Sequence, residues 1–281
     1  MEIHARLFVP DAEPRGCVSY VHGLQSHSGW FRATGTELAA AGFLALFADR
    51  RGSGRNPRDQ AGRSDPQVML DDVAEVLQQT HCIGAQRGVA RDRPLGLIGH
   101  SFGGLLATSA VCLGRARVDW LYLISPGLAQ KDNTKRVGRV ERLATTCKVF
   151  LAPRRSVAIR IPPWALTDSP AGRNFVRRDP LRLQRIEARF FRAAGFLHRQ
   201  LRQHASATPC PALLVLAGAD ELVDNRRTRQ AFERLFTGRR QVRIFDGCGH
   251  TLELTAARDE LVPELTRFLS GSPAQHPTPT A

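Results

Sequence analysis

Leu95-Gly-Leu-Ile-Gly-His-Ser-Phe-Gly-Gly104, followed directly by Leu105-Leu-Ala-Thr-Ser-Ala110, is the stretch of sequence that decides the fold. Its first four residues are an apolar run typical of a buried strand, and its second part is typical of a helix. Ser101 lies on the turn between them, with a glycine two residues away on either side. A serine on such a turn stands clear of the sheet edge, and the glycines let strand and helix pass closely. We therefore predict that Ser101 is a nucleophile; a plain tight turn is the alternative interpretation.

Short apolar runs alternate with longer helix-type segments along most of the chain. This alternation predicts the α/β class, with a mostly parallel, doubly wound sheet covered by helices on both faces. The expected strands are Ile3–Val9, Cys17–Val21, Phe43–Ala48, Leu95–Gly99, Trp120–Ser125, Ala212–Ala217 and Val242–Phe245. The expected helices are Trp30–Ala41, Val68–Thr80, Phe102–Leu113, Arg226–Phe236 and Leu254–Leu269. Ligands of such sheets bind at the carboxyl ends of the strands.

One segment interrupts the alternation. Residues 128–207 contain helical patterns rich in Arg, Phe and Leu, but no strand-like run flanked by turns. We predict a helical cap inserted into an α/β core of residues 1–127 and 208–270, with an extra helical layer as the alternative. The large apolar residues of this segment could line an acyl pocket or form the core of the cap: Phe150, Leu151, Trp164, Phe175, Phe190, Phe191 and Phe196. Residues 271–281, with three prolines among small and polar residues, are predicted to be disordered.

A serine hydroxyl needs a base, and the base needs a carboxylate to orient it. His250 follows the last expected strand in a glycine-rich loop and is the candidate base. Asp220 follows the strand Ala212–Ala217 and is the candidate carboxylate, with Asp224 as its main competitor. Six other histidines are expected to be solvated: His4, His27, His81, His198, His204 and His276.

Acyl transfer also needs N–H donors aimed at the oxyanion that develops on the substrate. One candidate donor is the backbone of Phe102, directly after the predicted nucleophile. The other is the backbone of Leu24, in the loop after the second expected strand, which we expect His22 to shape. The glycine-rich loop Asp49–Arg55 is expected to be a structural turn beside this site, because it lacks the spacing of a phosphate-binding loop.

The motifs together resemble those of one known family. They are His22-Gly-Leu24 with Ser28-Gly-Trp30, Asp49-Arg-Arg-Gly-Ser-Gly-Arg55, Gly99-His-Ser-Phe-Gly-Gly104, Gly218-Ala-Asp-Glu-Leu-Val-Asp224 and Gly249-His250. In this order, over about residues 15 to 270, they resemble the monoacylglycerol lipase and lysophospholipase branch of the α/β hydrolases, with a domain of the serine aminopeptidase S33 type. The resemblance implies an α/β-hydrolase fold, a triad of Ser101, Asp220 and His250, and Leu24 as an oxyanion donor.

The chain departs from the pattern of that family in two places. Arg51 stands where the family more often runs straight from Asp-x-Arg to Gly-His-Gly, and Ser53 replaces that histidine. The predicted cap keeps little beyond Asp179-Pro180-Leu181 and is unusually rich in arginine. The resemblance therefore bears on fold and chemistry more than on substrate.

Composition sets limits on partners. The 40 basic and 26 acidic residues give a formal charge of +14, and only Lys131, Lys135 and Lys148 are lysines. A GC-rich genome produces this arginine bias without a polyanionic partner, so nucleic acid is not expected, whereas transient contact with a membrane surface is compatible with it. No signal segment, Cys-x-x-Cys pair or metal-ligand spacing occurs, which favours a cytoplasmic protein without metal or cofactor. The oligomeric state is not predicted.

The leading hypothesis is a serine hydrolase that cleaves a small acyl ester, such as a monoacylglycerol or a lysophospholipid. An aminopeptidase or amidase could use the same three residues, with Glu141 or Glu187 in the predicted cap binding the substrate amine. The second alternative is a non-catalytic binding protein that retains the fold.

Overall fold

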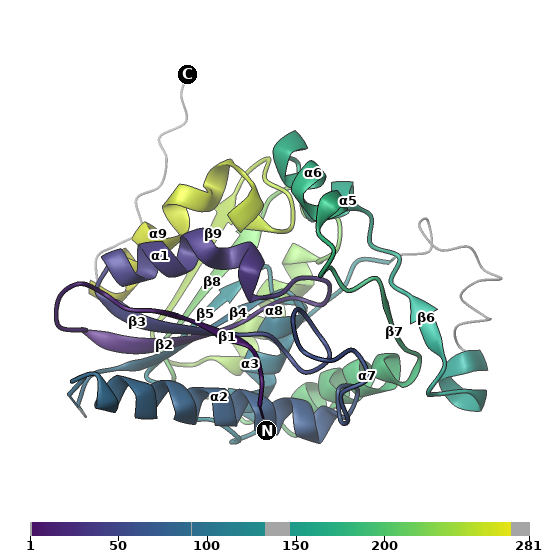
Figure 1. The fold of residues 1–281 in the computed structure, drawn as a ribbon, viewed down its shortest axis with the longest axis horizontal. Coiled ribbons are helices and arrows are strands. Elements are labelled where there is room, and N and C mark those ends of the chain that lie inside the picture. The colour runs from purple at the N-terminus through teal and green to yellow at the C-terminus, as the bar shows by residue number, and fades with distance from the viewer. Residues whose placement is uncertain (1, 91, 133–146, 271–281) are drawn as a thin grey trace.

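The computed structural model describes residues 2–90, 92–132 and 147–270, and its centre is a seven-stranded sheet (Figure 1). The strands are β1 (Ala5–Phe8), β2 (Gly16–Val21), β3 (Phe43–Ala48), β4 (Leu95–His100), β5 (Trp120–Ile124), β8 (Ala212–Ala217) and β9 (Arg240–Phe245). They lie in the order β1-β3-β2-β4-β5-β8-β9. Every neighbouring pair is parallel except β1 and β3, so the predicted mostly parallel sheet is confirmed.

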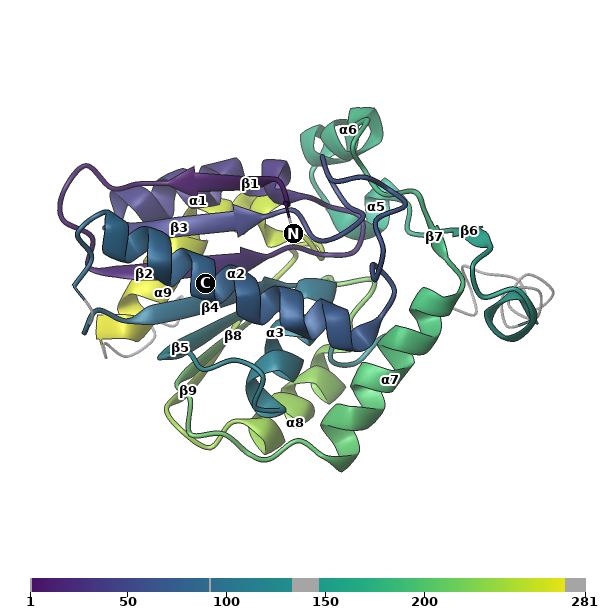
Figure 2. The same ribbon diagram turned by 60° about the horizontal axis from the view of Figure 1, so that its bottom comes forward.

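Helices cover both faces of the sheet, which makes it doubly wound. One face is covered by α1 (Arg32–Ala40) and α9 (Leu261–Ser270), and the other by α2 (Pro66–Gln86), α3 (Phe102–Cys112) and α8 (Asn225–Leu235) (Figures 1 and 2). None of the helices in the described ranges is long and apolar enough to cross a membrane.

The central strands are buried on both sides. In β8, Leu213 and Val215 pack into the cluster beneath α1 and α9, whereas Leu214 and Leu216 pack into the cluster on the opposite face. A strand covered on both faces needs apolar residues at every position, which explains the uninterrupted apolar run in the sequence.

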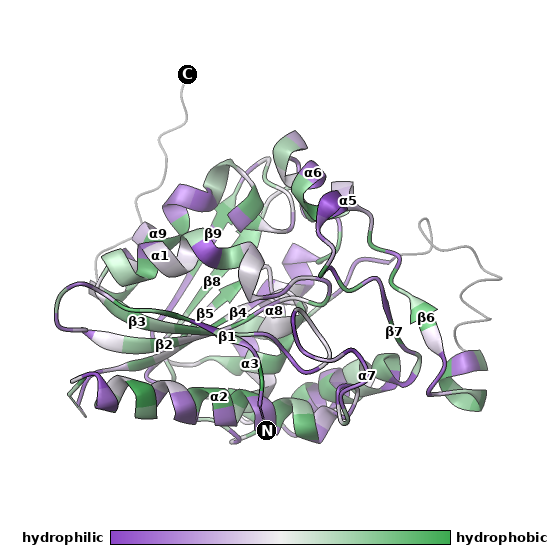
Figure 3. Cartoon of the chain, viewed as in Figure 1, coloured by the Kyte–Doolittle hydropathy of each residue, from purple (hydrophilic) through white to green (hydrophobic). Residues whose placement is uncertain are grey.

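The helix α2 shows how a surface helix is specified. Asp65 caps its first turn by accepting hydrogen bonds from the backbone N–H groups of Gln67 and Val68, and Pro66 occupies its first position. Its buried residues recur at three- and four-residue intervals, so that hydrophobic and hydrophilic bands alternate along it (Figure 3).

The segment between β5 and β8 contradicts one expectation. It holds the helices α5 (Pro163–Leu166), α6 (Pro170–Arg178) and α7 (Arg189–Gln203), but also an antiparallel pair of strands, β6 (Ser156–Ala158) and β7 (Arg185–Glu187). The prediction of a segment without strands was therefore wrong, because strands of three residues are too short to show an alternating pattern. Residues 133–146 of this segment and the tail predicted to be disordered, 271–281, lie outside the described residues.

Two of the predicted helices begin with 3-10 turns in the structure. The stretch predicted as the helix Leu254–Leu269 begins with the 3-10 turns η2 (Leu252–Leu254) and η3 (Ala256–Glu260), and only then continues as α9. Pro263 is compatible with the first turn of a helix but not with its interior, so the α-helix cannot begin much earlier. The stretch predicted as Trp30–Ala41 likewise opens with the 3-10 turn η1 (Ser28–Phe31).

The close approach of β4 and β5 yields a prediction about stability. A Cβ atom on Gly96 would lie 2.0 Å from the indole ring of Trp120, which is 3 % exposed. Gly96→Ala is therefore expected to destabilise the protein by roughly 1–3 kcal/mol, measured by chemical denaturation. The matched control is Gly195→Ala in α7, where nothing lies within 4 Å of the added Cβ. That variant should gain about 0.5–1 kcal/mol, and equal stability of the two variants would contradict the packing argument.

Candidate active site

Ser101 lies on a strained turn between β4 and α3. Its φ of 54° is in the left-handed region, which is unfavourable for a residue with a side chain. The backbone N–H of Ser101 donates to the carbonyl of Ile124 at 3.0 Å, and its own carbonyl accepts from Gly127 at 2.7 Å. A Cβ on Gly103 would lie 2.0 Å from the carbonyl oxygen of Val21, so glycine lets α3 pass close to the end of β2. This arrangement places the Ser101 side chain at the carboxyl edge of the sheet.

The structure brings the three predicted triad side chains together. Ser101 Oγ lies 2.8 Å from His250 Nε2, and His250 Nδ1 lies 2.7 Å from Asp220 Oδ2. His250 and Asp220 are each 1 % exposed, whereas Ser101 is partly accessible. If Nδ1 carries the proton of the neutral ring and donates it to Asp220, Nε2 is available to accept the hydroxyl proton of Ser101.

Asp220 is held as a carboxylate. Its Oδ1 accepts hydrogen bonds from the backbone N–H groups of Leu222 and Val223, at 2.7 and 2.8 Å. Burial by itself would raise the pKa of Asp220, but the neighbouring His250 and these hydrogen bonds outweigh it and lower the pKa. Asp224, the predicted competitor, instead accepts from the backbone N–H of Arg227 and caps α8.

The loop after β2 packs against the nucleophile. A Cβ on Gly23 would lie 3.2 Å from the Cβ of Ser101. The guanidinium group of Arg50 donates to the carbonyl oxygens of His22, Gly23 and Leu24 at 3.2, 2.9 and 3.0 Å. Because a trans peptide is planar, the N–H of Leu24 points away from the Gly23 carbonyl and therefore away from Arg50.

The second candidate donor lies on the other side of Ser101. Phe102 is the first residue of α3, so its N–H has no partner within the helix. The positive end of the helix dipole adds to the attraction of this position for negative charge.

His22 shapes this loop and is unsuited to act as a base. Its Nε2 accepts from the backbone N–H of Arg50 at 2.8 Å, and its Nδ1 donates to the carbonyl of Gly23 at 2.9 Å. Complete burial lowers the pKa of His22 to about 3, so the ring is neutral at physiological pH. The sequence did not predict a role for Arg50. The one indication of it is that Arg50 lies just after the end of an expected strand, in the loop Asp49–Arg55.

Two further contacts hold the loop that carries His250. The backbone N–H of Gly249 donates to Asp168 Oδ1 at 2.7 Å, and the N–H of Thr251 donates to the carbonyl of Leu166 at 2.6 Å. Both partners belong to the segment between β5 and β8, more than 80 residues away in the chain. No local pattern in the sequence indicates such contacts.

Asp179 joins α6 to the loop that precedes α1. Its Oδ2 lies 3.1 Å from His27 Nε2 and accepts a 2.6 Å hydrogen bond from the indole N–H of Trp30. Burial favours a higher pKa for Asp179, but the hydrogen bonds from His27 and Trp30 outweigh it and lower the pKa. The expectation that His27 is solvated was wrong, because the ring packs under Asp179 and is 6 % exposed.

The apolar residues predicted to line a pocket or to form the core of the cap differ widely in burial. Phe190 is buried, and its ring lies 4.8 Å from that of Phe102. Five others are more than 40 % exposed, which neither interpretation predicted: Phe150, Leu151, Trp164, Phe175 and Phe191. Phe196 is partly buried.

The contact between Asp168 and the His250 loop can be tested. Asp168→Ala removes the acceptor of the Gly249 N–H, and we expect the reactivity of Ser101 toward a fluorophosphonate probe to fall about tenfold. Asp168→Asn keeps an oxygen at that position and should restore most of the rate. An unchanged rate in Asp168→Ala would show that the loop is held without this bond.

Glu253, close to His250 in the chain, yields a prediction about pH. Burial raises its pKa from 4.5 to about 7, against the opposing effect of a hydrogen bond from the Tyr20 hydroxyl. The native state therefore binds a proton at Glu253 more tightly than the unfolded state, and this contribution to stability is lost as the pH rises from about 4.5 to about 7. Glu253→Gln should gain stability relative to the natural chain over that range, by up to about 3 kcal/mol in urea denaturation. A difference in stability that is independent of pH would contradict the argument.

The chain is similar to known proteins over most of its length. The family model described as "Serine aminopeptidase, S33" matches residues 12–254. A monoacylglycerol lipase of Mycolicibacterium smegmatis is 25 % identical over 248 residues, which cover 87 % of this chain and 84 % of that protein.

Two solved structures share the fold over nearly the whole length. The monoacylglycerol lipase of Paleococcus ferrophilus has a TM-score of 0.78 at 22 % identity, covering 97 % of this chain and 100 % of that one. A soluble variant of the monoglyceride lipase of Saccharomyces cerevisiae has a TM-score of 0.82 at 17 % identity, covering 96 % and 92 %. These likenesses confirm the predicted α/β-hydrolase fold.

Proposed function

Because the chain belongs to the serine aminopeptidase S33 family of α/β hydrolases, we propose that it cleaves a carboxylic ester, with Ser101 as nucleophile, His250 as general base and Asp220 as the orienting carboxylate. The observation that carries this proposal is the continuous pair of hydrogen bonds from the serine hydroxyl through the imidazole to the carboxylate, at 2.8 and 2.7 Å.

The first half of the reaction forms an acyl-enzyme. His250 Nε2 takes the hydroxyl proton of Ser101 as its Oγ attacks the ester carbonyl carbon. Asp220 stabilises the resulting imidazolium, since it is an ionised carboxylate in contact with Nδ1. The carbonyl oxygen becomes negatively charged in the tetrahedral intermediate.

The backbone N–H groups of Leu24 and Phe102 are the donors for that charge. Each such donor contributes about 3–4 kcal/mol to transition-state stabilisation in comparable sites. His250 then gives its proton to the leaving alkoxide, and the C–O bond of the ester breaks. In the second half, a water molecule attacks the acyl carbon by the same route and regenerates Ser101.

The proposed substrates are monoacylglycerols, lysophospholipids or similar small acyl esters. The relative of Mycolicibacterium smegmatis is named a monoacylglycerol lipase, and this chain matches most of its length. The exposed apolar side chains between β5 and β8, among them Phe150, Leu151 and Trp164, support a transient contact with a lipid surface during substrate uptake.

An aminopeptidase is the second candidate, because the name of the matching family includes that activity. The sequence hypothesis used Glu141 or Glu187 to bind the substrate amine. Glu187 is instead bound by Arg63 at 3.0 Å and Arg189 at 2.8 Å, and Glu141 lies outside the described residues. Faster turnover of amino-acid amides than of p-nitrophenyl esters would favour the aminopeptidase.

The assignment of the nucleophile and base makes a direct prediction. Ser101→Ala should abolish labelling by a fluorophosphonate probe, and His250→Ala should slow it by at least two orders of magnitude, because the hydroxyl then has no base. Asp220→Asn should lower ester turnover by several orders of magnitude. Ser206→Ala, an exposed serine, should label like the natural chain. Full labelling of Ser101→Ala in a folded protein would refute the assignment.

A further inference from the structure

A groove of about 360 Å³ lies between the loop that follows β3 and the β6–β7 hairpin. Arg50, Arg51, Arg58 and Arg63 line it on one side. Arg154, Arg182 and Arg185 line it on the other, at or beside the two short strands. We call this feature the arginine groove. The arginine bias of the chain accounts for the number of arginines, but not for the convergence of seven on one hollow from two distant segments.

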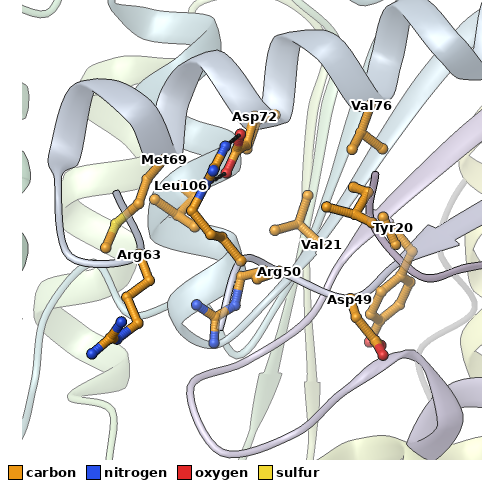
Figure 4. Close-up of a pocket in the computed structure, with 13 residues that line it drawn as sticks. Tyr20, Val21, Asp49, Arg50, Arg63, Met69, Asp72, Val76 and Leu106 are labelled. Atoms are coloured by element: carbon orange, nitrogen blue, oxygen red, sulfur yellow. Dashed lines mark hydrogen bonds and ion pairs between the residues drawn. The ribbon is translucent and has the colours of Figure 1, made fainter. Parts of the chain in front are cut away.

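Charge within the arginine groove is not balanced. Of the residues that the structure describes, Asp59 and Glu187 alone contribute carboxylates to its lining. Glu187 is already engaged by Arg63, and by Arg189 outside the groove. Arg51 pairs with Asp72 at 2.6 Å. Asp72 lies on α2, in a neighbouring pocket that shares Arg50, Arg51 and Arg63 with the groove (Figure 4). Among the described lining residues, five arginines therefore share one carboxylate, Asp59, that forms no ion pair, while Asp49 and Asp179 attract Arg50 and Arg182 from outside the lining.

Backbone carbonyls fix several of these arginines without neutralising them. Arg58 donates to the carbonyl of Leu181 at 2.6 Å, and Arg182 donates to that of Ile161 at 2.6 Å. Arg185 donates to the carbonyl of Ser156 at 3.0 Å. A carbonyl oxygen orients a guanidinium group but leaves its positive charge, so these side chains are preorganised for an anion.

Unused donors remain within the groove. Arg182 Nε is buried and has no hydrogen-bond partner among the described residues. The Arg154 side chain is exposed and forms no hydrogen bond or ion pair within the described ranges. The exposed Arg154 guanidinium group therefore keeps donors that an anion entering the groove can bind.

Two arginines of the groove contact residues next to the proposed nucleophile and oxyanion donors. Arg182 also donates to the side chain of Gln25, the residue after Leu24, at 3.0 Å. Arg50 binds the Leu24 carbonyl, and its guanidinium carbon lies 5.2 Å from the centre of the Phe102 ring. Arg50 and Arg182 therefore link the groove to the residues that carry both proposed oxyanion donors, on the side of Leu24 that carries its carbonyl oxygen.

We propose that the arginine groove binds the anionic head group, a phosphate or a carboxylate, of the ester that Ser101 cleaves. This inference rests on the proposed ester-hydrolase function and narrows its substrate to anionic mono-acyl esters. The planar guanidinium group of arginine matches the geometry of phosphate and carboxylate oxygens, and the seven arginines that line the hollow suit an anionic head group better than an acyl chain. The size of the groove, and the contacts of Arg50 and Arg182 with Leu24 and Gln25, favour a substrate over a nucleic acid.

Binding can be measured without hydrolysis by using two ethers that differ only in one phosphate group, 1-O-octylglycerol and 1-O-octylglycerol 3-phosphate. Calorimetry on the natural chain should give at least about tenfold tighter binding of the phosphate. In the double variant Arg154→Gln/Arg185→Gln the two affinities should come within about twofold of each other. The matched control, Arg87→Gln/Arg117→Gln, removes the same charge from exposed positions after α2 and before β5, and should keep the preference.

Several outcomes would overturn the proposal. Equal affinities in the natural chain, or a preference that survives in the groove variant, would show that the groove does not select charge. Inorganic phosphate binding as tightly as the octyl phosphate would indicate a site for free anions. Tighter binding of a short oligonucleotide, lost in the same variant, would indicate nucleic acid.

Kinetics separate this inference from the function on which it rests. With 1-octanoylglycerol and 1-octanoylglycerol 3-phosphate as substrates, KM should be about tenfold lower for the phosphate ester, and the groove variant should abolish that ratio. Turnover of both esters with equal KM would contradict head-group binding in the groove but would support the proposed ester hydrolysis. If neither ester is turned over, the proposed ester hydrolysis is contradicted. The binding measurements with the two ethers would still test whether the groove selects the phosphate.

Discussion

The left-handed backbone at Ser101 is the constraint on which the rest of the site depends. Such a conformation costs roughly 1–3 kcal/mol for a residue with a side chain and persists only when its surroundings determine it. Here the neighbouring strand β5 supplies the restraint through Ile124, and Gly127 binds the Ser101 carbonyl. The same turn ends β4, starts α3 and aims the hydroxyl at His250, so strand pairing and the chemistry of the site share one set of bonds.

Much of this arrangement could be predicted because its signals are local. The strand Ala212–Ala217 is apolar at every position, since both of its faces are buried, and its bounds are those expected. The carboxyl ends of parallel strands meet at one edge, and therefore Ser101, Asp220 and His250 could be placed together before their contacts were known. Their catalytic roles stay predictions.

The features of the fold and of the site that the sequence did not predict depend on contacts between distant segments. Arg50, Asp168 and Asp179 act by meeting backbone or side-chain groups far away in the chain, and nothing in their own neighbourhoods indicates those partners. The β6–β7 hairpin is too short for a periodic pattern, and its pairing is visible only when the loops around it are packed. The antiparallel direction of β1 is equally invisible, because it depends on which neighbour the strand joins and not on its composition.

The bonds from Leu166 and Asp168 to the two neighbours of His250 have a consequence for protein engineering. The insertion between β5 and β8 cannot be exchanged as an independent module, because it supplies part of the scaffold that orients the imidazole. A chimera that grafts the corresponding region of a relative onto this sheet would need an acceptor oxygen at the place of Asp168. Without it, the hybrid could have a well-formed new pocket and a misaligned base.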